Sequence, residues 1–253
     1  CESLLNSSNK EAIINILYGF QDHFFLNFKQ EICEILIRNY SNLLLMNRIE
    51  SDQTDAGLYN EIIQYLLLSF SKIINDETIK IIDDNGDNIF HFLFDSLLSN
   101  NEDILYAASE LVSALVSFDQ AHEFLTSPDV MDKIFELASD SPFSIRKNMI
   151  STLCDLIKQQ STEPNLMFLS RGILDLLIDF LDTDQNDNTL EVVEGIQYLI
   201  ESIEETDKMN LVVDKINENK YSFEKLDERE IENISRVVKR ILDSIQNHTI
   251  ENI

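Results

Sequence analysis

The sequence contains no tryptophan and very little glycine or proline, with five and three residues in a chain of 253. Sandwiches, barrels and doubly wound sheets need such turn residues at many connections, so this scarcity disfavours them. The hydrophobic fraction of 44% is nevertheless large enough to bury a core. We therefore expect an all-α protein whose helices are joined by polar loops.

Basic residues are also scarce. Lys and Arg total 19 against 46 Asp and Glu, which gives a formal net charge of −27. This charge opposes an approach to nucleic-acid phosphates or to an anionic membrane surface, so we expect neither as a partner. A basic partner would be attracted instead. The alternative, that the charge only keeps the protein soluble, stays open.

Cysteine is limited to Cys1, Cys33 and Cys154, an odd number without paired spacing. Neither a disulfide framework nor a zinc site is indicated, and a reducing compartment, cytoplasmic or nuclear, is expected. The chain also lacks a signal-peptide pattern and any run approaching the roughly 20 apolar residues of a membrane span. It begins at Cys1 rather than Met, so it could be a portion of a longer protein.

The most informative stretch is residues 165–204. It predicts a short helix, a break at Arg171-Gly172, an apolar helix over Ile173–Leu181, a polar loop and a third helix. In the third helix apolar residues recur every three or four positions: Val193, Ile196, Leu199, Ile200 and Ile203. One face is therefore apolar, and such a unit needs neighbouring copies to cover it.

Copies of this pattern are present upstream. A short apolar turn, a break and an apolar helix recur, and each set is followed by a longer helix. The recurring segments are residues 78–100, 121–140 and 165–184, and the longer helices are residues 104–118, 144–159 and 190–204. Nearer the amino terminus, helical patterns cover residues 12–20, 24–40, 42–49 and 59–74.

The spacing of the longer helices is regular. Their central leucines are taken as Leu67, Leu111, Leu153, Leu199 and Leu242, at intervals of 44, 42, 46 and 43 residues. This period lies in the range of armadillo and HEAT units. We predict one domain, residues 1–253, with about six repeats. Their approximate bounds are 11–40, 41–76, 77–119, 120–160, 161–206 and 207–246.

The three-helix layout, with a small or apolar residue followed four positions later by Leu, resembles the armadillo repeat over about residues 11–245. The resemblance implies a right-handed α-α superhelix. Within that superfamily, residues 211–245, LVVDKINENKYSFEKLDEREIENISRVVKRILDSI, are similar to the closing segment of importin α. In that segment an acidic turn and a short helix lead into a final amphipathic helix.

The resemblance implies a concave groove lined by the third helices. In importin α a Trp there stacks on the alkyl stem of a peptide Lys, and an Asn four residues later clamps the peptide backbone. The matching positions here are Tyr65 and Ser69, Ser109 and Ser113, Ser151 and Asp155, Gln197 and Glu201, and Arg240 and Ser244. The carboxylates of Asp155 and Glu201 can accept hydrogen bonds from Lys or Arg but cannot donate as Asn does. Alternatively, these residues are simply solvated positions on a helix face.

The resemblance thus implies an adaptor that binds a protein or basic peptide in its groove, with a role in nuclear import together with an importin β carrier. No Arg-rich arm for such a carrier occurs in these residues. A second hypothesis is a chaperone cofactor or assembly chaperone of armadillo type. It would bind a folded partner, such as an Hsp70-type ATPase or a proteasome subunit.

Enzymatic chemistry is not indicated. The sequence has no nucleophile elbow, phosphate-binding Gly loop or paired His metal motif, so we expect no enzyme, no cofactor and no metal site. Residues 83–87 begin like a calcium loop, but Gly86 stands at the fourth place rather than the sixth. A turn is expected there, as at Gly172. His91 lies among phenylalanines and is expected to be packed in the core.

Overall fold

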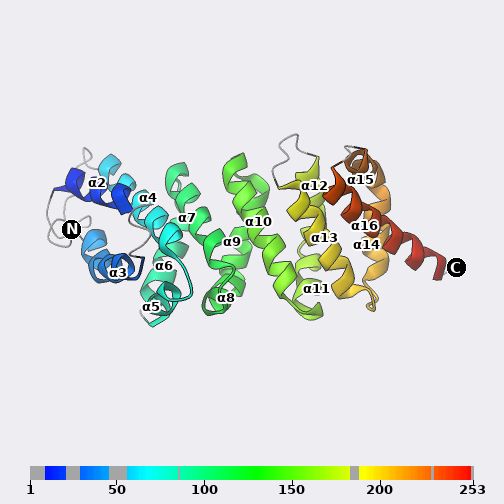
Figure 1. The fold of residues 1–253 in the computed structure, drawn as a ribbon, viewed down its shortest axis with the longest axis horizontal. Helices are drawn as coiled ribbons and strands as arrows, with labels where there is room; N and C mark the ends of the chain where they lie inside the picture. The colour runs from blue at the N-terminus through cyan, green and yellow to red at the C-terminus, as the bar shows by residue number, and fades with distance from the viewer. Residues whose placement is uncertain are drawn as a thin grey trace. The chain divides into compact units, whose positions relative to one another are not determined.

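The computed structural model describes residues 9–20, 29–45, 56–84, 86–182, 188–228 and 231–251. Within these ranges every regular element is an α-helix (Figure 1). The helices are α2 (Lys10–Phe20), α3 (Lys29–Leu45), α4 (Ala56–Ile73), α5 (Thr78–Asp84), α6 (Gly86–Leu97), α7 (Glu102–Leu115), α8 (Asp119–Thr126), α9 (Pro128–Asp140), α10 (Phe143–Gln159), α11 (Thr162–Ser170), α12 (Ile173–Leu181), α13 (Thr189–Ile203), α14 (Met209–Glu218), α15 (Lys220–Asp227) and α16 (Glu232–Glu251).

The chain folds into two compact units, with the boundary between Met149 and Ile150 inside α10. In the N-terminal unit α2 packs along α4, α4 packs along α7, and α6 covers α7. In the C-terminal unit α11 and α12 pack on α13, α13 packs along α16, and α15 covers α16. Long helices therefore lie beside long helices, and shorter helices close their remaining apolar sides. We call α4, α7, α10, α13 and α16 the third helices.

Local signals set the helix boundaries. Asn101 caps α7, because its side-chain oxygen accepts a hydrogen bond from the Ile104 amide at 3.1 Å. Ser127 is extended, with φ −61° and ψ 143°, and Pro128 begins α9, as expected for the residue before proline and for proline at a helix start. Gly172 separates α11 from α12 with φ 85°, which confirms the predicted turn.

The core follows the predicted periodicity. The apolar residues singled out in the third helix of residues 165–204 are all buried in α13, with relative exposures of 2% or less: Val193, Ile196, Leu199, Ile200 and Ile203. The pairs of helices predicted around residues 121–140 and 165–184 form as α8 with α9 and as α11 with α12. The arrangement of one domain with six repeats stays a prediction.

Two local expectations are corrected. His91 is exposed on α6, whereas the neighbouring Phe90 stacks on Phe124 at 4.8 Å and Phe92 is buried. A helix turns by about 100° per residue, so adjacent residues cannot all face the core. The run expected as a separate helix from residue 42 continues α3 without a break as far as Leu45.

Cys1, His23, Asn85 and residues 46–55 lie outside the described residues, and so do the side chains of residues 83–88. The proposed turn in place of a calcium loop therefore stays a prediction. In the part of the chain that is described, no helix combines the length and the apolar character that a membrane crossing requires.

Candidate partner-binding surface

A shared spacing of buried residues allows the third helices to be aligned with one another. Each contains two adjacent buried residues, then a third buried residue three positions later, and a fourth after a further four positions. The third members of this pattern are Leu66, Leu111, Leu153, Ile196 and Ile241, and the fourth are Phe70, Leu115, Ile157, Ile200 and Ile245. We call Leu66, Leu111, Leu153, Ile196 and Ile241 the register residues.

The register residues correct the predicted central leucines. Leu111 and Leu153 are confirmed as equivalent positions, but Leu67, Leu199 and Leu242 are displaced from the register by one, three and one position. Leu242 is only half-buried. The reason is that isoleucine occupies the register position in α13 and α16, while leucines stand nearby on other sides of the same helices.

Two of the predicted partner-binding side chains are inaccessible. Ser69 and Ser109 both have a relative exposure of 0%. The Ser69 hydroxyl donates to the carbonyl oxygens of Tyr65 and Leu17, at 2.7 and 3.1 Å, across the packing of α2 on α4. Ser109 donates to the Tyr106 carbonyl at 2.7 Å and is covered by Asn148. Neither hydroxyl can contact a partner in this structure.

The other predicted side chains are at least partly accessible: Tyr65, Ser113, Ser151, Asp155, Gln197, Glu201, Arg240 and Ser244. Tyr65 makes an edge-to-face contact with Tyr18, whose ring is 5.8 Å away. Gln197 donates to Glu201 on the same helix at 2.5 Å. Ser113, Ser151 and Asp155 were counted from Leu111 and Leu153 and keep equivalent positions. The others do not join this column, because they were counted from Leu67, Leu199 and Leu242, which lie outside the register.

Counting two positions before and after each register residue gives equivalent pairs, which we call the surface pairs although Ser109 is itself buried. They are Gln64 and Leu68, Ser109 and Ser113, Ser151 and Asp155, Glu194 and Tyr198, and Lys239 and Asp243. This count adds Gln64, Leu68, Glu194, Tyr198, Lys239 and Asp243, which the sequence prediction did not include, and the predicted partner-binding residues stay a prediction. The signal that could have found them is the adjacent apolar pair that precedes each register residue, for example Val192-Val193 in α13.

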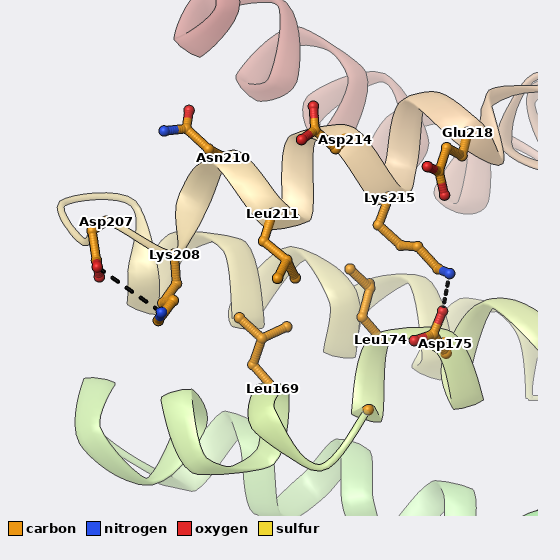
Figure 2. A pocket seen from close by; sticks show the side chains of 11 residues that line it. Leu169, Leu174, Asp175, Asp207, Lys208, Asn210, Leu211, Asp214, Lys215 and Glu218 are labelled. Carbon is orange, nitrogen blue, oxygen red and sulfur yellow. Dashed lines mark ion pairs between the residues drawn. The ribbon is translucent and has the colours of Figure 1, made fainter.

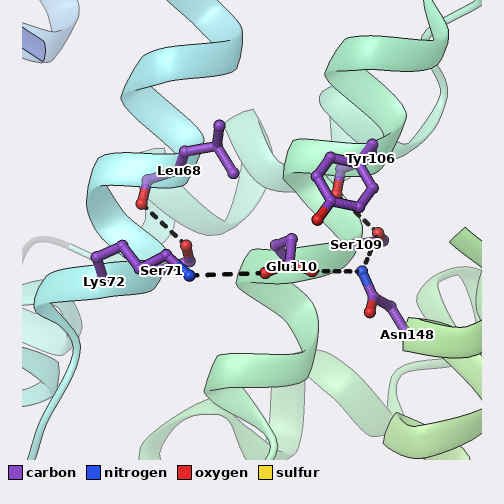
Figure 3. A network of polar contacts seen from close by, with 7 residues as sticks. All are labelled: Leu68, Ser71, Lys72, Tyr106, Ser109, Glu110 and Asn148. Atoms are coloured by element: carbon purple, nitrogen blue, oxygen red, sulfur yellow. Dashed lines mark hydrogen bonds and ion pairs between the residues drawn. The ribbon is translucent and has the colours of Figure 1, made fainter. Parts of the chain in front are cut away.

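In the N-terminal unit a polar network links α4, α7 and α10 (Figure 3). The Asn148 amide donates to Glu110 and to Ser109, each at 2.9 Å, and Lys72 lies 3.9 Å from the other Glu110 oxygen. Burial raises the pKa of Tyr106, and the charge of Glu110 together with their hydrogen bond raises it further. These polar side chains of α4, α7 and α10 are therefore engaged in contacts between neighbouring third helices.

A corresponding network links α10 and α13 in the C-terminal unit. Ser151 donates to Glu191 at 2.6 Å, and Asn188 donates to the second oxygen of Glu191 at 3.0 Å. Lys158 lies 3.6 Å from both Asp155 and Glu194. Ser151 and Lys158 thus join α10 to α13, whereas Asp155 pairs with Lys158 within α10.

The exposed face of α13 is acidic and carries one large aromatic ring. Glu191, Glu194, Tyr198 and Glu201 follow one another at intervals of three or four residues. Tyr198 is 47% exposed, and the Glu194 side chain is 40% exposed. Carboxylates can accept hydrogen bonds from a cationic side chain, and a tyrosine ring can lie against its alkyl stem or its charge. This face is therefore suited to a basic segment.

A hollow of about 540 Å³ lies elsewhere in the C-terminal unit, between α12 and α14 (Figure 2). Leu211 of α14 points into it opposite Leu169 and Leu174, and Lys215 forms an ion pair with Asp175 at one end. The hydrogen bond with Asp175 raises the pKa of Lys215. Across the described residues no three His, Cys, Asp or Glu side chains gather in a way that could hold a metal ion.

No protein-family model and no curated protein matches the chain. Several solved structures are similar to the chain. A designed armadillo repeat protein is similar with a TM-score of 0.71 and 16% identity, over 96% of this chain and 98% of that one. A second, in complex with peptide (KR)4, has a TM-score of 0.70 and 15% identity over 96% and 97% of the two chains. Computationally designed armadillo repeat proteins for modular peptide recognition have a TM-score of 0.61 and 15% identity over 92% and 98%.

The chain has an armadillo-type repeat fold. The predicted all-α repeat architecture of this type is thereby confirmed. At these identities the likeness shows the fold alone, so the similarity to importin α is not carried further by it. The five surface pairs occupy equivalent positions of the third helices, as judged from the common pattern of buried residues.

Proposed function

We propose that this chain is a protein-binding repeat protein whose third helices, α13 above all, bind a basic extended segment of a partner. The observation that carries the proposal is the exposed acidic face of α13, with Tyr198 at its centre. The formal net charge of −27 would attract a basic segment from a distance and speed its association. Among proteins of similar fold, one is in complex with the basic peptide (KR)4.

Each part of the face has a role in this proposal. Glu194 and Glu201 would accept hydrogen bonds from Lys or Arg side chains, since Lys158 and Gln197 engage only part of their acceptor capacity. Tyr198 would lie against the alkyl stem of the same basic side chain. Glu191 already accepts hydrogen bonds from Ser151 and Asn188, so it would attract the basic segment through its negative charge rather than through direct contacts.

The test is a titration of a labelled Lys-Arg peptide with the full chain at low salt, followed by fluorescence anisotropy. The variant Glu194→Lys with Glu201→Lys is expected to weaken binding by about tenfold or more, because a charge-assisted contact becomes a repulsion. The matched control, Glu163→Lys with Asp179→Lys, makes the same change in net charge at exposed positions of α11 and α12. Equal effects of the two variants would overturn the proposal.

A more specific proposal is that this chain is an importin-α-like adaptor in nuclear import, located in the cytoplasm and nucleus. The resemblance of residues 211–245 to the closing segment of importin α supports it, together with the proposed preference for basic segments. The chain departs from importin α in having no Trp and no Asn in the surface pairs. Stable complex formation with an importin β carrier, measured by size-exclusion chromatography, would support this role, and its absence would count against it.

A second candidate is an assembly chaperone or chaperone cofactor that holds a folded partner. The observation that favours it is the composition of the third-helix surface pairs. The positions that follow the register residues are Leu68, Ser113, Asp155, Tyr198 and Asp243, and none has the amide that can clamp a peptide backbone through a donor and an acceptor. A folded partner identified by pull-down, and not displaced by the Lys-Arg peptide, would decide for this candidate.

A further inference from the structure

Two positions of the third-helix surface reverse their charge between α13 and α16, while the position of Tyr198 is taken by Asp243 on α16. The buried residues Val192, Val193 and Ile196 of α13 correspond to Val237, Val238 and Ile241 of α16. In this register Glu191 is equivalent to Arg236, and Glu194 is equivalent to Lys239. The same two surface positions therefore carry carboxylates on one repeat and cations on the next.

The basic face of α16 comprises Arg236, Lys239 and Arg240, which are all exposed and lie three and four residues apart on one side of the helix. Arg236 donates to Asn233 in the preceding turn. Lys239 lies 3.4 Å from Asp227, but its side chain is 63% exposed, so this ion pair holds it only weakly. The three cations therefore present most of their charge to solvent.

The two faces are neighbours in one compact unit, because α13 packs along α16. In the described residues no ion pair joins a carboxylate of α13 to a cation of α16. Neighbouring helices lie about 8–10 Å apart, and an extended chain rises about 3.3 Å per residue, so a bound segment passes from one helix to the next within about three residues. A short segment can therefore meet both faces.

We propose that the C-terminal unit binds an extended segment in which a block of basic residues adjoins a block of acidic residues. The basic block lies over α13, at Glu194, Tyr198 and Glu201, and the acidic block lies over Arg236, Lys239 and Arg240 of α16. This inference rests on the proposed function and adds the charge order of the partner to it. A segment that is basic throughout meets attraction on α13 and repulsion on α16, which selects against it.

The test measures how tightly three peptides of the same composition bind to the full chain at low salt. Two peptides have a basic block of about six residues joined to an acidic block of equal length, in either order, and a third alternates the two charges. At least one of the block peptides is expected to bind about tenfold more tightly than the alternating peptide, because only separated charges can meet both faces at once. Affinities within about twofold of one another would overturn the inference.

A charge-reversal variant locates the acidic block. In Arg236→Glu with Lys239→Glu and Arg240→Glu, the block peptide should bind about tenfold more weakly while an all-basic peptide binds more tightly. The matched control, Lys208→Glu with Lys220→Glu and Lys225→Glu, changes the net charge equally at exposed positions around α14 and α15, and should move both peptides in the same direction. Identical behaviour of the two variants would overturn the inference.

The two proposals fail in different ways. If the all-basic peptide binds and depends on Glu194 and Glu201, but charge order has no effect, the proposed function stands and the inference falls. If neither the all-basic peptide nor any mixed peptide binds, both fall. The comparison of peptides uses the unaltered chain, so the inference stays testable even if a reversal variant fails to fold.

Discussion

Gly195 of α13 lies directly against Cys154 of α10. A Cβ atom placed on Gly195 would stand 2.9 Å from the Cys154 sulfur and 3.2 Å from the Cys154 Cβ. A Cβ contact of 2.9 Å essentially never occurs, and one of 3.2 Å is tighter than most, so the missing side chain of Gly195 lets two third helices approach. Both residues are buried, and Cys154 has a relative exposure of 0%.

Gly195→Ala is expected to lower the free energy of unfolding by about 1–3 kcal/mol, the usual cost of adding a methyl group to a closely packed core. Cys154→Ala in the same chain should recover most of this loss, because it removes the sulfur that the new methyl group meets. Gly57→Ala is the control: no heavy atom lies within 4 Å of its added Cβ. Urea denaturation measures all four proteins, and a loss in Gly195→Ala that Cys154→Ala leaves unchanged contradicts the account.

Cys33 and Cys154 should be unreactive in the folded protein. Both are buried, and burial raises the pKa of each thiol, that of Cys33 to about 12. The thiolate is the reactive species, so labelling at neutral pH should wait for unfolding. In a Cys1→Ser background, an Ellman titration should detect neither thiol until urea unfolds the chain. Rapid reaction of either thiol in native buffer would show that the site opens more readily than this packing allows.

The raised thiol pKa also predicts loss of stability in alkali. An unfolded cysteine ionises near pH 8.5, while folded Cys33 keeps its proton to about pH 12. Its contribution is fully present below the unfolded pKa, and stability falls above it by about 1.4 kcal/mol per pH unit because the unfolded state loses the proton first. Between about pH 8 and pH 10, the free energy of unfolding of Cys33→Ala should fall less steeply with pH than that of the parent chain, as measured by urea denaturation. An unchanged slope would contradict the prediction.

The network around Glu110 should depend more on Asn148 than on Lys72. Asn148 donates to Glu110 and Ser109 at 2.9 Å, whereas Lys72 is half-exposed and 3.9 Å from Glu110. Asn148→Ala is expected to cost about 1.5–3 kcal/mol, as for a hydrogen bond to a charged group, and Lys72→Ala about 0–1 kcal/mol. Thermal and urea unfolding of both variants measure the two losses of stability. A larger loss for Lys72→Ala than for Asn148→Ala would contradict the prediction for the network in Figure 3.

Helix boundaries were predictable because their signals are local. Pro128 and Gly172 act within one turn of the helices that they separate, and the apolar residues of α13 mark its buried side without reference to other helices. The repeat period also followed from the sequence, since each unit must cover the apolar face of the next. These features need only neighbouring residues and the geometry of the α-helix.

The surface positions were harder to predict because they depend on rotation about each helix axis. Leu199 and Ile196 are both apolar and both buried, so the helical period, without the adjacent pair Val192-Val193, does not say which is the register residue. The choice moves the predicted surface pair of α13 from Gln197 and Glu201 to Glu194 and Tyr198. The burial of Ser69 depends equally on a contact with Leu17, 52 residues earlier in the chain.

The sequence by itself determined an all-α chain, the approximate bounds of several helices, such as α10, α12 and α13, and a repeated three-helix unit, because propensity, capping and apolar period act over a few residues. Only the tertiary structure decided which polar side chains join repeats, as Ser151 joins α10 to Glu191 of α13, and which face solvent. It also decided that an acidic face on α13 stands beside a basic face on α16. These relations depend on how helices about 40 residues apart rotate and slide when their apolar faces pack, and no local pattern encodes that.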